Sequence, residues 1–169
     1  MTSKPSLLEQ ALRICRLDFS PRHGQPSVLR VVTATVLALG LSLAADACLV
    51  AIGTAVFPST KGYVHFEFSD YGKLTIIGVL IACAAWPAVT RITNHPRWMF
   101  FRMAIAVTLV LWLPDLYILA KGQPGKAVAV LMTMHLAIAI VTYNCLVHLA
   151  PPHSGPTLDL ADRRITQER

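Results

Sequence analysis

The chain has 169 residues, of which 54% are hydrophobic and only 14% are charged, and its formal net charge is +6. Soluble domains carry charge on roughly a quarter of their residues, so this composition argues against a soluble fold and for an integral membrane protein. The basic balance does not call for nucleic acid as a partner, because the charges flank apolar segments, where they set membrane topology and contact anionic lipid.

A basic segment precedes the first apolar run. Residues 6–18 (SLLEQALRICRLD) repeat apolar side chains at helical spacing, and Ser6 with Glu9 fits a capping box. The pattern predicts an amphipathic helix lying in the cytoplasmic interface, with a partly ordered tail as the alternative. We assign residues 1–27 to this cytoplasmic segment, residues 28–150 to a membrane domain and residues 151–169 to a cytoplasmic tail.

Four long apolar runs follow, at about residues 30–57, 74–91, 100–120 and 127–149. Each approaches the roughly 20 residues that a helix needs to cross the hydrocarbon core of a bilayer. The sequence therefore predicts an all-α integral membrane protein, a bundle of four transmembrane helices.

Lysine and arginine are distributed unequally around these runs. Eleven lie before the first run, between the second and third runs, or in the tail, whereas the other two connections hold four, all of them lysine. The positive-inside rule places both termini in the cytoplasm and predicts a multi-pass protein of the plasma (inner) membrane. An even number of spans agrees with this orientation.

The connection between the first two runs, PSTKGYVHFEFSDYG at residues 58–72, alternates apolar and polar side chains as an extended strand does. We expect a flap that rests on the outer ends of the helices, with His65, Glu67 and Asp70 closing a pocket from outside. A tilted lead-in to the second span is the alternative.

Three ionisable residues lie inside the apolar runs: Asp46, Asp115 and His135. A helical rise of about 1.5 Å per residue puts all three in the outer half of the bilayer. A carboxylate that faces lipid costs at least ~2.5–3.5 kcal/mol, so we expect the three to converge on one pocket, where Asp46 pairs with His135 or shares a proton with Asp115. The other side chains expected to line this pocket are Ser42, Thr108, Trp112 and Thr142.

These residues predict a polar pocket that binds a lipid-like ligand or a membrane partner, either another subunit or a second copy. An acid/base enzyme is the alternative: Asp46 or Asp115 would be a general acid and His135 a base or orienting group, isomerising or cyclising an isoprenoid- or steroid-like substrate without a cofactor. A purely structural hydrogen-bonded knot between helices remains open. A transporter is less favoured because four spans lack inverted repeats, and no metal is expected because no metal-binding spacing occurs.

Met132-Thr133-Met134-His135, opening the fourth run, accompanies Asp46 and the pair Pro114-Asp115. In these features the chain resembles small four-helix membrane proteins, common in actinobacteria, that are grouped as a family of unknown function. The resemblance covers about residues 30–149 and implies the four-helix fold. It implies no activity, since the family has none assigned. It also implies that asparagine is frequent at the position of Asp46, so that the carboxylate is special to this chain.

Overall fold

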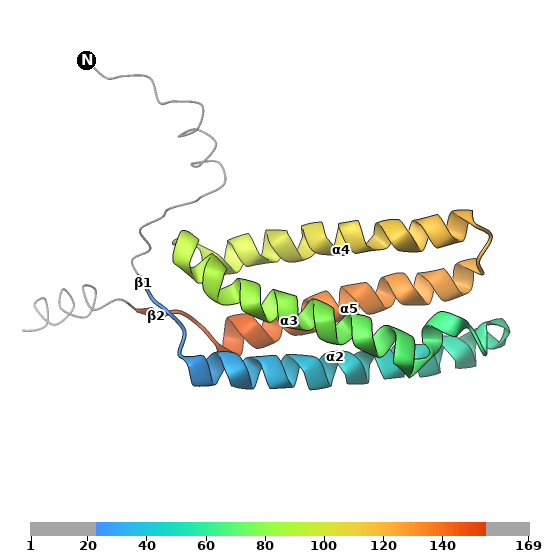
Figure 1. Cartoon of the computed structure of the whole chain (residues 1–169), viewed down its shortest axis with the longest axis horizontal. Coiled ribbons are helices and arrows are strands. Elements are labelled where there is room, and N and C mark those ends of the chain that lie inside the picture. The colour runs from blue at the N-terminus through green and yellow to red at the C-terminus, as the bar shows by residue number, and fades with distance from the viewer. Residues whose placement is uncertain (1–22, 155–169) are drawn as a thin grey trace, which may run out of the picture.

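The structure of the chain, a computed structural model, describes residues 23–154 (Figure 1). The predicted helix at residues 6–18 lies outside these described residues. The elements in chain order are β1 (His23–Gly24), α2 (Val28–Val56), the 3-10 turns η1 (Pro58–Thr60) and η2 (Val64–Phe66), α3 (Phe68–Ile92), α4 (Pro96–Ala120), α5 (Gly125–Leu149) and β2 (His153–Ser154).

The four long helices confirm the predicted all-α fold, and each is long and apolar enough to span a membrane. The predicted start of the second span is wrong by six residues, since α3 begins at Phe68 instead of residue 74. Asp70 lies in the first turn of α3, where its negative charge interacts favourably with the helix dipole. Because the first turns of this helix contain polar residues, the apolar run marks only the part of the helix that follows them.

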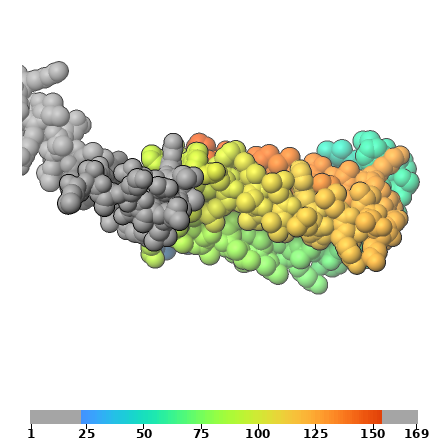
Figure 2. Space-filling view, turned by 90° about the horizontal axis from the view of Figure 1, so that it is seen from above, coloured from blue at the N-terminus to red at the C-terminus, as the bar shows by residue number. Residues whose placement is uncertain are grey.

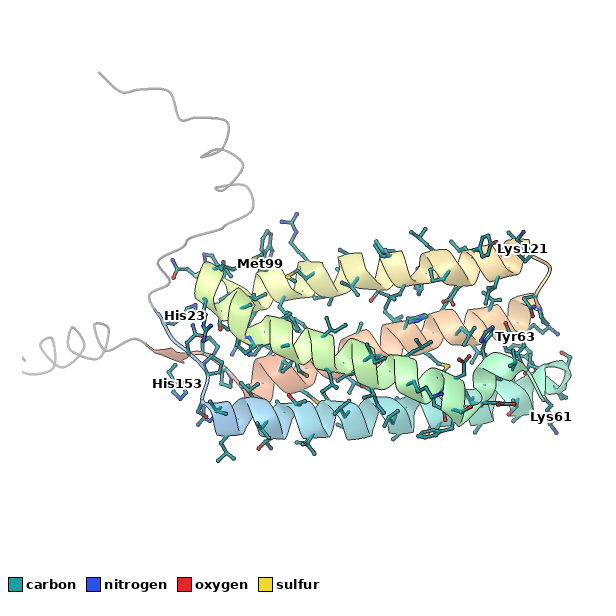
Figure 3. All side chains as sticks on the ribbon, in the orientation of Figure 1. His23, Lys61, Tyr63, Met99, Lys121 and His153 are labelled. Carbon is teal, nitrogen blue, oxygen red and sulfur yellow. The ribbon has the colours of Figure 1, made fainter. Side chains whose placement is uncertain are left out.

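α2 and α4 lie on opposite sides of the bundle, with α3 and α5 between them (Figure 1). The most extensive packing joins α2 to α5, and α4 packs mainly on α5. We call the end that carries β1 and β2 the terminal end and the opposite end the distal end. His23 and His153 lie at the terminal end, and Lys61, Tyr63 and Lys121 lie at the distal end (Figure 3).

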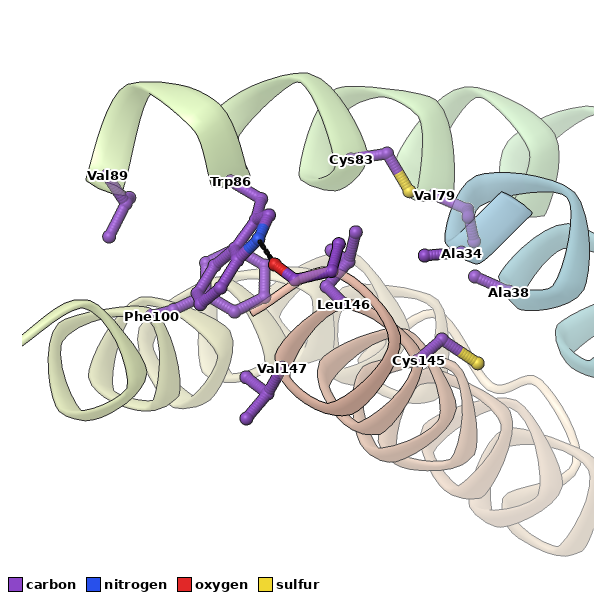
Figure 4. Packing of buried hydrophobic residues seen from close by; sticks show 11 residues of the cluster. Ala34, Ala38, Val79, Cys83, Trp86, Val89, Phe100, Cys145, Leu146 and Val147 are labelled. Atoms are coloured by element: carbon purple, nitrogen blue, oxygen red, sulfur yellow. Dashed lines mark hydrogen bonds between the residues drawn. The ribbon is translucent and has the colours of Figure 1, made fainter. Parts of the chain in front are cut away.

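An apolar core fills the terminal half of the bundle. Trp86 on α3 is fully buried, and its indole N–H donates a hydrogen bond of 2.9 Å to the carbonyl of Ala150, just beyond α5 (Figure 4). The ring of Phe100 on α4 packs against the indole with 5.1 Å between ring centroids. Leu146 and Val79 complete the fully buried centre. This half of the bundle is closed by close-packed apolar side chains.

The two short strands hold the chain ends together at the terminal end. β1 pairs antiparallel with β2, with His23 opposite Ser154 and Gly24 opposite His153. The His23 ring also lies 3.0 Å from the carbonyl oxygen of Thr93, which follows α3. The segment before α2, the segment after α5 and the α3–α4 connection are thus fixed to one another.

The outer surface of the helices is apolar, and α4 is the most exposed of the four. Figure 2 looks onto α4, whose side chains cover that face of the bundle. Leu109, Leu113 and Leu116 on this helix are 54%, 61% and 47% exposed. So continuous an apolar surface is unfavourable in water and favourable in lipid, so the exposed surface agrees with a membrane protein.

The predicted extended conformation of residues 58–72 is wrong. The segment forms η1 and η2, and its last five residues belong to α3. Pro58 opens η1, and Gly62, with a φ of 77°, turns the chain between the two 3-10 turns. Turns satisfy backbone hydrogen bonds locally, which a single strand without a neighbour cannot do. The segment still rests on the helices, because Phe66 is buried in a cluster with Val130 and Met134 of α5.

α2 and α5 approach each other closely at Gly53. A Cβ atom at Gly53 would lie 2.8 Å from Cγ2 of Val130. At Gly40, also on α2, none of the described atoms outside the helix's own backbone lies within 4 Å of such a Cβ.

Gly53→Ala should therefore lower the free energy of unfolding by about 1–3 kcal/mol, because the added methyl group forces Val130 or a helix to shift. Thermal unfolding in mild detergent measures the change. Gly40→Ala is the matched control and should be as stable as the parent or slightly more so, since alanine is the better helix former. Equal melting temperatures for the two variants would show that the α2–α5 contact is not tight at Gly53.

Candidate functional site

Four polar side chains, one from each long helix, lie in the distal half of the bundle: Asp46 on α2, Thr75 on α3, Asp115 on α4 and His135 on α5. We call them the polar layer. Each lies five to ten residues from the distal end of its helix, or roughly 8–15 Å at the helical rise. The layer combines the three ionisable residues that the sequence singled out with one that it did not.

Asp115 and His135 form a pair between α4 and α5. Nδ1 of His135 lies 3.0 Å from Oδ2 of Asp115, and the two side chains are 25% and 8% exposed. The carboxylate fixes the orientation of the imidazole ring and leaves its other nitrogen, Nε2, outside the pair. His135 is thus the accessible member of the pair and Asp115 the buried one.

Asp46 is completely buried and is paired with α3. The hydroxyl group of Thr75 donates a hydrogen bond of 2.6 Å to Oδ2 of Asp46. Within residues 23–154, Asp46 is hydrogen-bonded to neither His135 nor Asp115, so the predicted pairing is wrong. His135 is nevertheless close enough to act on Asp46 electrostatically. The structure brings the three ionisable residues together as two neighbouring pairs.

The distal connection covers this layer. Nδ1 of His65 lies 2.6 Å from Oδ2 of Asp70, and both side chains are partly exposed. The ring of Tyr63 meets the His65 ring edge-on, with 5.3 Å between centroids. Burial raises the pKa of Tyr63, and the charge of Asp115 adds to this effect. His65 thus belongs to the cover through Asp70, whereas Glu67 is exposed at the start of α3 and lies outside the polar layer.

A groove of about 340 Å³ runs along the bundle surface between α4 and α5. It begins at Trp112 and Leu136, directly beside Asp115 and His135 in their helices, and extends toward the terminal end. The indole N–H of Trp112 donates a hydrogen bond of 3.1 Å to the carbonyl of Met132 on α5. The residues that line the groove are Phe101, Ala104, Ile105, Thr108, Leu109, Trp112, Leu136, Ala139, Ile140, Tyr143 and Asn144. Its wall is therefore almost wholly apolar, and Asp115 and His135 lie just beyond its distal end without lining it.

The remaining predicted pocket residues divide between two places. Thr108 and Trp112 line the groove. Ser42 and Thr142 lie in the bundle interior, where their hydroxyl groups are buried without a hydrogen-bond partner among the described residues. Across residues 23–154, no three histidine, cysteine or acidic side chains are grouped as metal ligands.

Thr75 is the member of the polar layer that sequence reasoning missed. A threonine in an apolar run is unremarkable, since its hydroxyl group ordinarily bonds to a carbonyl of its own helix. Its position seven residues into α3, at the same depth below the distal end as the predicted carboxylates, is the signal that could have identified it.

A family model described as "Family of unknown function (DUF6069)" matches residues 21–150. No curated protein and no solved structure matches the chain. The matched range contains the segment on which the resemblance to a four-helix family of unknown function was recognised. That the family is common in actinobacteria stays a prediction.

Thr75→Val should lower the free energy of unfolding by about 1–3 kcal/mol, because a buried carboxylate then loses a hydrogen-bond donor while the side-chain volume is preserved. Thermal or denaturant unfolding in detergent measures this loss. Thr33→Val is the control, since the Thr33 hydroxyl is exposed and bonds to the carbonyl of Leu29 in its own helix. If both variants are equally stable, the Thr75–Asp46 contact contributes nothing to the fold.

Proposed function

The chain belongs to the DUF6069 family, whose function is unknown, and we propose that it is a small multi-pass membrane protein that binds a lipid-like molecule between α4 and α5. One observation carries the proposal: the distal end of the apolar groove, at Trp112 and Leu136, lies within one helical turn of Asp115 and His135 along α4 and α5, although neither member of the pair lines the groove. An amphipathic ligand would place its apolar chain in the groove and its polar group at the histidine.

The groove is large enough for such a ligand, since small-molecule pockets commonly measure roughly 300–1,000 Å³. Its apolar wall alone would not select a ligand, because membrane lipid tails are as apolar as leucine and isoleucine. Selection would come from the polar pair. Asp115 holds the imidazole ring of His135 in one orientation, so Nε2 can form a directed hydrogen bond with a hydroxyl, carbonyl or phosphate oxygen.

The orientation in the membrane is part of this proposal. The connections at the distal end and their flanks carry only Lys61, Lys73, Lys121 and Lys126, whereas the other basic residues of the described part lie toward the terminal end: Arg30, Arg91, Arg97 and Arg102. The remaining seven basic residues of the sequence precede residue 23 or follow residue 154. The positive-inside rule supports a cytoplasmic terminal end and a plasma-membrane location. The Asp115–His135 pair would then lie in the outer half of the bilayer.

The geometry of the pair favours a second candidate function, the acid/base isomerase or cyclase acting on an isoprenoid- or steroid-like substrate. A histidine oriented by a buried carboxylate is the usual arrangement of a general base. In this alternative the groove binds the substrate and His135 exchanges a proton with it. The enzyme and the binding protein share a site and differ in whether the bound molecule is altered.

Ala104→Phe tests the site, because Ala104 lines the groove and a phenyl ring there would fill it. Native mass spectra of protein extracted in mild detergent should show a bound lipid-like mass on the parent and not on this variant. Ala106→Phe is the matched control on the same helix, since Ala106 is exposed and lies outside the groove lining. It should keep the bound mass.

A bound mass that survives in Ala104→Phe would place the ligand elsewhere. Association with a second copy or another membrane protein, without any small bound molecule, would overturn lipid binding in favour of the partner prediction. A bound mass that changes during incubation in the parent but not in His135→Asn would support the enzyme.

A further inference from the structure

Three of the buried side-chain oxygen atoms that lack a hydrogen-bond partner among the described residues lie in the helical bundle: Oδ1 of Asp46, Oγ of Ser42 and Oγ1 of Thr142. All three residues are at least 95% buried. A buried polar atom without a partner is costly, so three of them in one bundle call for an explanation.

The two hydroxyl groups differ from the other hydroxyl groups of the same helices. A helical serine or threonine can always donate to the carbonyl three or four residues earlier. The threonines that do so on α2, α4 and α5 are Thr33, Thr35, Thr54, Thr108 and Thr133. Ser42 and Thr142 do not form this bond, although they are buried and need it more.

The three residues lie at similar depths in the bundle interior. Ser42 and Asp46 are four residues apart on α2 and therefore share a face, with Cβ atoms about 5–6 Å apart. On the neighbouring α5, Val130 contacts Gly53. Ser42 lies eleven residues before Gly53 on α2. Because α5 runs antiparallel to α2, the residue at the same depth on α5 lies eleven residues after Val130, at position 141. Thr142 is the next residue and is therefore level with Ser42.

Asp46 also lacks a cationic partner. The ion pairs among the described residues join His65 to Asp70 and His135 to Asp115, and no described lysine or arginine pairs with Asp46. A carboxylate removed from water and left without a counter-charge is strongly destabilising. The Thr75 hydroxyl satisfies one of its oxygens but brings no charge.

We propose that the bundle interior binds a small monovalent cation, Na⁺, through the carboxylate of Asp46 and the hydroxyl oxygens of Ser42 and Thr142. Hard cations take oxygen ligands, and carboxylate and hydroxyl oxygens are what these residues offer. A single positive charge neutralises the single carboxylate, whereas a divalent ion would leave a net charge in a low-dielectric interior. The site is separate from the groove, and the inference does not rest on the proposed lipid ligand.

The cation would enter from the distal end. On the terminal side of Ser42 the interior is filled by the apolar core around Val79, Trp86 and Leu146 (Figure 4). On the distal side lie the polar layer and Tyr63, whose buried hydroxyl group also lacks a partner among the described residues. The distal route therefore passes the oxygen and nitrogen atoms of the polar layer.

The test is the melting temperature of the full chain in detergent, in NaCl and in choline chloride of equal ionic strength. We expect Na⁺ to raise the melting temperature by about 2–4 °C or more, in a manner that saturates with concentration. Asp46→Asn should abolish the difference between the salts, and Ser42→Ala should shift the response to higher Na⁺. Thr33→Ala should keep the parent's response.

Equal melting temperatures in the two salts would overturn the proposal, as would a Na⁺ response that persists in both Asp46→Asn and Ser42→Ala. If Asp46→Asn does not fold, the comparison of Ser42→Ala with Thr33→Ala provides the test.

The same titration run at several pH values distinguishes Na⁺ binding from proton binding. The titratable groups that face Asp46 are Tyr71 on α3 and His135 on α5, with Asp115 beyond on α4. A stability that depends on pH but not on Na⁺, and loses that dependence in Asp46→Asn, would assign the site to a proton.

Discussion

The structure depends on one constraint: inside a bilayer, a polar side chain must find its partner within the protein, in its own helix or on a neighbouring one, because no water is available. The bundle meets this constraint differently in its two halves. The terminal half is filled with apolar side chains, and its one buried indole N–H reaches the carbonyl of Ala150. The distal half contains one polar side chain from each long helix, paired as Asp46 with Thr75 and as Asp115 with His135. Each pair joins two different helices, so these pairs bind the helices to one another as well as forming the candidate site.

The number of spans and their approximate positions could be predicted, because bilayer thickness fixes helix length and lipid fixes the apolar composition. The partner of Asp46 could not. Which face of a helix meets its neighbour depends on its rotation, and helices that are apolar all round carry little record of that rotation in their sequence. Depth below the membrane surface follows from counting residues, so the common level of Asp46, Asp115 and His135 could be predicted. That Asp46 is bonded to Thr75, and not to His135, could not. The alternating pattern at residues 64–68 predicted a strand wrongly. So short a pattern is equally compatible with a 3-10 turn followed by the start of a helix, which is what the structure shows.

α4 joins the bundle through the apolar core, where Phe100 packs on Trp86, and through the residues that form the candidate site. It packs mostly on α5, makes smaller contacts with α3 and exposes most of its surface. Its polar connections to α5 within the membrane are the Asp115–His135 pair and the bond from Trp112 to the carbonyl of Met132, three residues away from that pair on each helix. A molecule in the groove would contact the same two helices along this seam. The position of α4 and the occupancy of the groove by a ligand would therefore be coupled, because any change in the helix spacing would alter both.

His135 lies between the two proposed sites and is the side chain through which they would communicate. It is hydrogen-bonded to Asp115 at the distal end of the groove, and it acts electrostatically on Asp46 in the interior. A charge placed at Asp46 is therefore felt by the imidazole ring that would hold the polar group of a ligand. Coupling of this kind is reciprocal: if a cation at Asp46 changes the affinity for the ligand, the ligand changes the affinity for the cation by the same factor. The carboxylate of Asp46 would then make ligand binding depend on cations without altering the groove itself.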